Sequence, residues 1–108
     1  EHPTIRRLGK RDLEYDVPVS VLEAIKGTSI TVPTPTGDVK VSVPKGIGSG
    51  RRLRLKGRGI QSPNNPGDLY LKLIPTAPVT EELAAIAAAE ALEAFYLGDV
   101  RQKLKDAI

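Results

Sequence analysis

The stretch that decides the fold is GRRLRLKGRGI, residues 50–60, in which five of the eleven side chains are cationic. In a strand, successive side chains point to opposite faces, so Leu53 and Leu55 would share one face while Arg52 and Arg54 share the other. We interpret this segment as a strand with a buried leucine face. The long cationic side chains of its other face would cover apolar surface while their charged ends stay in water.

The alternative interpretation is that this row of cations contacts the phosphates of DNA without reading bases. The aromatic residues that usually stack on single-stranded nucleic acid are scarce, because the chain has one Phe, three Tyr and no Trp. Both interpretations stay open on the residues alone. The candidate phosphate contacts are Arg51, Arg52, Arg54, Lys56 and Arg58.

Composition limits the class of protein. With 108 residues the chain has the length of one domain, and because it starts at Glu1 we expect it to be part of a longer protein. The absence of Cys excludes disulfides and thiolate metal sites and is typical of a cytoplasmic protein. No apolar run is long enough to span a bilayer, so we expect no membrane partner. Residues 1–78 carry 13 Lys/Arg and 7 Asp/Glu, whereas residues 79–108 carry 3 and 6.

Short alternating segments predict a mainly β fold, either a small sandwich or a barrel. Ser20 and Glu23 have capping-box spacing and Gly27 can end a helix, so a short helix is expected over about 20–27, with its apolar residues on the core. Gly37 favours a hairpin between the strands at 29–33 and 39–44. The other strands are expected at 12–19, 51–58 and 68–75.

From Thr80 the sequence changes to strong helix formers, which predicts a helical tail over about 80–107 with a break at Gly98 and Asp99. On a continuous helix its large apolar residues would lie on opposite sides, so more than one surface must cover them. We expect a second copy to do so in a homodimer, while folding onto the chain's own sheet is the alternative. The candidate dimerisation residues are Leu83, Ile86, Leu92, Phe95, Tyr96 and Leu97.

Catalytic and cofactor chemistry are not indicated by the residues. His2 is the only histidine, and Asp12, Glu14 and Asp16 are expected to share a solvated strand edge. The glycine-rich KGIGSGRR at 45–52 lacks the ending of a phosphate loop and is followed by a strand pattern instead of a helix. We therefore expect no enzyme, no metal site and no cofactor.

Residues 12–75 resemble the second C-terminal domain of the J-proteins, the DnaJ co-chaperone family. The resemblance rests on DLEYDVPVSVLEAIKGT, on VPTPTGDVKVSVPKG, on SGRRLRLKGRG and on GDLY, which occur in the order of the family. It implies a two-sheet β-sandwich over 12–77, preceded by a connector over 1–11 and followed by a helical dimerisation tail over 78–108. The His-Pro-Asp motif of a J-domain is absent, because Thr4 follows Pro3.

The resemblance also implies a function. J-proteins hold unfolded client polypeptides, deliver them to a DnaK-type heat-shock chaperone and dimerise through the C-terminus. An extended client would add to an exposed strand edge, for which SITVP at 29–33 is the candidate, with Ile30 and Val32 as client-binding residues. The alternative is that both are core residues. The chain is similar to the zinc-free, curved-DNA-binding subtype, which keeps architectural DNA binding as the alternative function.

Overall fold

Four strands form the larger sheet of the protein, for which a computed structural model describes residues 4–48 and 50–108. Their spatial order is β1 (Ile5–Leu8), β2 (Asp12–Ser20), β6 (Leu69–Thr76) and β5 (Arg51–Leu55). β2 and β6 run parallel, and the other two pairs are antiparallel. Residues 5–8, which the sequence assigned to a connector, are therefore part of the sheet.

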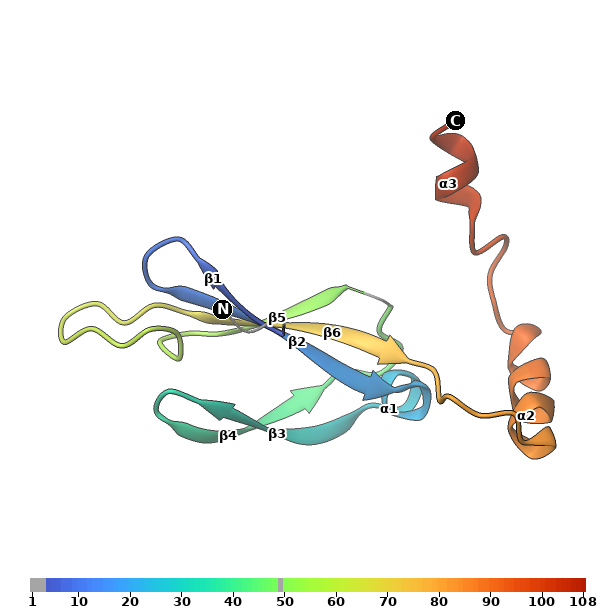
Figure 1. Cartoon of the computed structure of the whole chain (residues 1–108), viewed down its shortest axis with the longest axis horizontal. Coiled ribbons are helices and arrows are strands. Elements are labelled where there is room, and N and C mark those ends of the chain that lie inside the picture. The colour runs from blue at the N-terminus through green and yellow to red at the C-terminus, as the bar shows by residue number, and fades with distance from the viewer. Residues whose placement is uncertain (1–3, 49) are drawn as a thin grey trace. The chain divides into compact units, whose positions relative to one another are not determined.

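The second sheet is a hairpin of β3 (Thr28–Thr34) and β4 (Gly37–Val43), and it forms a separate layer in Figure 1. The hairpin closes at the pair Thr34 and Gly37, where Gly37 has a φ of 112° that only glycine adopts readily. The predicted hairpin is confirmed, and with it the two-sheet β-sandwich.

The core lies between the two sheets and is centred on β6. Leu69, Leu71 and Leu73 are 0% exposed, and each such buried leucine stabilises the fold by roughly 1.5–3 kcal/mol. Leu53 and Leu55 of β5 pack against this core, while the three arginines of the same strand are exposed. The interpretation of this segment as a strand with an inward leucine face is thus confirmed, but the strand ends at Leu55 and not at the predicted residue 58, because a turn begins at Lys56.

The short helix α1 (Val21–Lys26) follows β2 and begins with the predicted capping box. The Glu23 amide donates to Ser20 Oγ at 3.1 Å, and the Ser20 amide donates to Glu23 Oε1 at 2.8 Å. The expectation that its larger apolar residues lean on the core was wrong for two of them, because Leu22 is 67% and Ile25 52% exposed. Ala24 is buried instead, and its carbonyl accepts a hydrogen bond from the Ile47 amide at 3.1 Å, in the loop after β4.

The long loop between β5 and β6 is held by backbone hydrogen bonds to the turn between β1 and β2. The Ile60 amide donates to the Arg11 carbonyl at 2.8 Å, and within the loop the Gly59 amide donates to the Gly67 carbonyl at 2.9 Å. Gly67 lies so close to Arg11 that a Cβ atom would stand 1.9 Å from the Arg11 carbonyl oxygen. Only glycine fits this position without a backbone shift.

Residues 78–108 form a second unit with two helices, α2 (Leu83–Glu93) and α3 (Gln102–Asp106). Both helices are shorter than predicted. Thr80 accepts a hydrogen bond from the Glu82 amide at 3.1 Å, and Asp99 accepts one from the Arg101 amide at 2.8 Å, so each side chain closes a turn just before the helix that follows it. Within the described ranges, neither helix has the length and apolar character needed to cross a membrane.

Candidate functional site: a groove beside an open strand edge

An apolar groove lies in the first unit between the chain near β1, the middle of β2 and the second half of β3. Its volume is about 370 Å³. Each of the two sheets contributes to its walls, because β1 and β2 belong to one sheet and β3 to the other. The apolar lining residues are Ile5, Tyr15, Val17, Pro18, Ile30, Val32 and Pro33.

β3 borders this groove and has an open edge, because β4 is the one strand that pairs with it in the described part of the chain. Such an edge exposes backbone N–H and C=O groups that can pair with another extended chain, and proteins commonly protect it with charges. The strands β1, β4 and β5 also form sheet edges, and each contains charged residues. β3, with the sequence TSITVPT, contains none.

The two predicted client-binding residues both line the groove, but they differ in exposure. Val32 is 3% exposed and packs with Val41, Leu69 and Leu71, so its side chain is mainly a core residue. Ile30 is partly buried and packs against two groups of buried core residues, one with Val43 and Leu73 and the other with Val41 and Leu71. The sequence missed the opposite wall, because the alternation of Tyr15 and Val17 predicts an inward face without saying which strand lies across from it.

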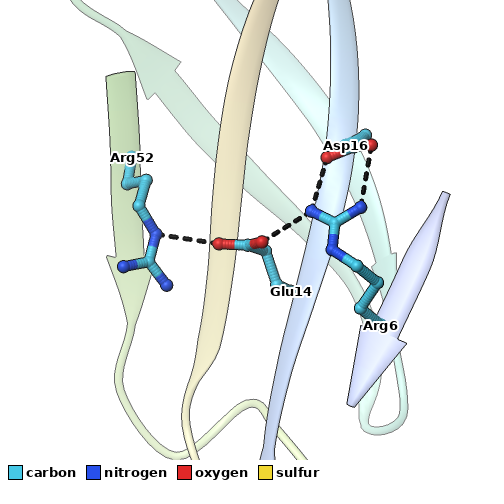
Figure 2. Close-up of polar contacts among 4 residues, drawn as sticks. All are labelled: Arg6, Glu14, Asp16 and Arg52. Carbon is cyan, nitrogen blue, oxygen red and sulfur yellow. Dashed lines mark hydrogen bonds and ion pairs between the residues drawn. The ribbon is translucent and has the colours of Figure 1, made fainter. Parts of the chain in front are cut away.

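Beside the groove, β1 is joined to the outer face of the sheet by a network of four charged residues (Figure 2). Arg6 donates two hydrogen bonds to Asp16, at 2.8 and 2.6 Å, and one to Glu14 Oε1 at 2.5 Å. Glu14 also pairs with Arg52 Nε of β5 at 2.9 Å. The Arg52 guanidinium lies 4.4 Å from the centre of the Tyr70 ring, a cation–π contact on the intervening strand.

This network corrects the expectation of a solvated edge at Asp12, Glu14 and Asp16, because β2 is an interior strand of the larger sheet. The Glu14 side chain is only 12% exposed. Hydrogen bonds from Arg6 hold the pKa of both Glu14 and Asp16 below the ordinary values, and the same bonds raise the pKa of Arg6. Asp12 accepts a hydrogen bond from the Asp68 amide at 2.8 Å.

The predicted phosphate contacts are partly occupied by protein partners. Arg52 pairs with Glu14 as described, and Arg54 Nε donates to Asp68 Oδ2 at 2.8 Å. A hydrogen bond from the Gly57 amide and that from Arg54 lower the pKa of Asp68. The Arg58 guanidinium donates to Thr36 Oγ1 at 2.8 Å. Among the residues described by the structure, Arg51 and Lys56 form no ion pair and are exposed.

The predicted dimerisation residues all belong to the second unit. Leu83, Ile86 and Leu92 lie on α2. The helix ends at Glu93, however, so Phe95 lies in the turn that follows it, and Tyr96 and Leu97 lie in a segment without regular secondary structure. The prediction of one continuous helix through these residues was wrong. Of the six residues, Leu92 is half-buried and the other five are exposed.

His2 lies outside the described residues, so its predicted lack of a catalytic role stays a prediction.

Comparison with known proteins gives a consistent family. A family model described as the DnaJ C terminal domain matches residues 1–78. Proteins named "Curved DNA-binding protein" from Escherichia coli O1:K1 / APEC and from Shigella flexneri are 42% identical over 87 residues. The alignment covers 79% of this chain but 28% of each relative, so the chain spans less than a third of their length.

Proposed function

Because this chain belongs to the DnaJ C terminal domain family, we propose that it is a co-chaperone module that holds unfolded client segments for a DnaK-type heat-shock chaperone. The observation that carries the proposal is the coincidence of an apolar groove with an uncharged open strand edge at β3. An extended client gains main-chain hydrogen bonds from such an edge and places side chains in the adjacent groove. An unfolded polypeptide offers both features, because its backbone is unpaired and its apolar residues are exposed.

The experiment that tests this proposal changes the charge of two strand edges separately. Thr31→Lys introduces a cation on the edge of β3, where the native side chain is exposed. Ser42→Lys introduces the same charge at an exposed position of β4 and serves as the matched control. Binding is measured by the fluorescence anisotropy of a labelled, permanently unfolded protein.

We expect Thr31→Lys to weaken client binding at least several-fold, while Ser42→Lys binds like the wild type. Equal binding by both variants would show that the β3 edge is not used. A wild-type protein that fails to bind the unfolded client at all would contradict the proposed function.

We also propose that residues 78–108 dimerise the protein. The support is that large apolar side chains of this unit remain uncovered within it, including Leu83 at 82% and Phe95 at 78% exposure. In a twofold contact the same patch of each copy meets itself, so one segment can cover another of identical sequence. Two linked modules would raise the affinity for a client that carries two binding segments, because the second contact is intramolecular.

DNA binding is the second candidate function, and a specific observation favours it. The relatives that match 79% of the chain are named as curved DNA-binding proteins, and exposed Arg51 and Lys56 are available for phosphates. Against it, Arg52 and Arg54 would have to leave their carboxylate partners. Binding to duplex DNA should fall between 50 and 200 mM salt, by about tenfold for the two phosphate contacts of Arg51 and Lys56, if this function holds. Salt-independent binding, or none, would exclude phosphate recognition.

A further inference from the structure

The strand β1 supplies one wall of the groove, although it lies at an edge of the larger sheet (Figure 1). Thr4 and Ile5 line the groove together with Tyr15 of β2. In the described part of the chain β1 pairs with β2 alone, none of its four residues is buried, and Ile5 is 38% exposed. A segment that buries so little opens locally at a lower free energy than the whole fold. β1 can therefore leave the sheet while the core around β6 stays intact.

The side chain of Arg6 holds β1 against the outer face of the sheet. Its guanidinium donates two hydrogen bonds to Asp16 and one to Glu14, and both carboxylates belong to β2 (Figure 2). Hydrogen bonds between charged groups are stronger than neutral ones, and the paired bonds to Asp16 also fix the orientation of the guanidinium. Because these bonds require β1 to lie beside β2, they contribute to the free energy with which β1 docks.

The backbone amides of β2 report separately on its two neighbouring strands. In an interior strand, successive residues direct their N–H groups alternately to one neighbour and to the other. The Asp16 amide donates at 2.8 Å to the carbonyl of the residue before β1, and the Leu13 amide donates at 2.9 Å to that of the residue before β6. Glu14 shares the direction of Asp16, and these two are the β1-facing amides. Tyr15 and Val17 share the direction of Leu13 and are the β6-facing amides.

We propose that Arg6 is a positioning residue of the groove. Its bonds to β2 keep β1 on the sheet, and docked β1 places Ile5 as a wall against which a client packs. β1 opens and closes as one unit while the rest of the sheet stays formed, and the client binds the closed state. By linkage, a bound client then stabilises the docking of β1 by the same factor by which docked β1 strengthens client binding. This inference rests on the proposed function and assigns to it a residue of the outer face.

The test is amide hydrogen exchange of the whole chain, followed residue by residue by NMR. Arg6→Gln removes the guanidinium that holds β1. Arg54→Gln is the matched control, because it removes an arginine–carboxylate bond, to Asp68, at the opposite edge of the same sheet. Ile5→Thr keeps a β-branched residue in the strand but replaces part of the apolar wall by a hydroxyl group. The ligand is the same permanently unfolded protein as above.

In Arg6→Gln we expect the β1-facing amides to exchange about tenfold faster, between the effect of an exposed ion pair and that of a sheltered hydrogen bond to a charge. The β6-facing amides should keep the wild-type rate, and Arg54→Gln should leave the β1-facing amides unchanged. Saturating client should slow the β1-facing amides of the wild type by about fivefold or more. Ile5→Thr should weaken client binding about fourfold, the loss of one buried methylene-sized group, and leave the exchange of the free protein unchanged.

The contrary results separate the parts of the proposal. Faster exchange of both sets of amides in Arg6→Gln would show that β1 does not open by itself, and unchanged exchange would show that Arg6 does not hold it. A bound client that leaves the β1-facing amides unprotected, or that binds Ile5→Thr like the wild type, would show that β1 is not a wall of the client site. The proposed function would still stand in these cases if Thr31→Lys weakens binding. A wild type that binds no unfolded client would overturn both the proposed function and its coupling to β1.

Discussion

Glu14→Gln removes the charge that joins β1 to β5 across the larger sheet. In the native protein Glu14 accepts from Arg6 at 2.5 Å and pairs with Arg52 at 2.9 Å, and its side chain is 12% exposed. A hydrogen bond to a charged group contributes about 1.5–3 kcal/mol when sheltered, and an exposed ion pair contributes about 0.2–1 kcal/mol. Arg6 keeps Asp16, and the glutamine oxygen can still accept one bond.

We therefore expect Glu14→Gln to lower the free energy of unfolding by about 1–2 kcal/mol at pH 7. This value lies between the contribution of a sheltered hydrogen bond to a charged group and that of an exposed ion pair. The measurement is urea unfolding followed by circular dichroism. Asp38→Asn is the control, because it removes an exposed carboxylate of β4 that forms no ion pair in the described part of the chain.

The pH dependence of this difference tests its cause. The pKa of Glu14 is lower in the folded protein than in the unfolded chain, so its stabilisation is complete above the unfolded value of about 4.3 and is lost as the pH falls through the folded pKa. The difference between wild type and Glu14→Gln should therefore shrink below about pH 4. An unchanged stability at pH 7, or a difference that stays constant down to pH 3, would refute this account.

Two further predictions concern the loop and the tail. Gly67→Ala should destabilise the fold by about 2–3 kcal/mol, because the added methyl group would stand 1.9 Å from the Arg11 carbonyl, whereas Gly48→Ala meets nothing within 4 Å and should have little effect on thermal unfolding. The wild type should be a dimer by light scattering, and Leu92→Asp combined with Phe95→Asp should give a folded monomer. A monomeric wild type at high concentration would contradict the proposed dimer.

The pattern of residues was sufficient for most local elements of the sandwich, although it missed the strand β1. Alternation predicted the strands around Leu53 and Leu71, and the spacing of Ser20 and Glu23 predicted the start of α1, because both signals depend on backbone geometry over a few residues. The ends of the tail helices were less predictable, since no Gly or Pro stands between Glu93 and Gly98 although α2 ends at Glu93. Helix length depends on tertiary contacts as well as on propensity.

What the sequence by itself determined is which residues face inward along the predicted strands, and hence a small β-sandwich or barrel with a cationic outer face on β5, and the family resemblance chose the two-sheet sandwich between them. Only the tertiary structure decided that Glu14 lies inside a sheet, and that Ile5, Tyr15 and Ile30 line one groove. The physical reason is that pleating is local, with a period of two residues, whereas the order of strands depends on which buried faces meet after distant segments have come together.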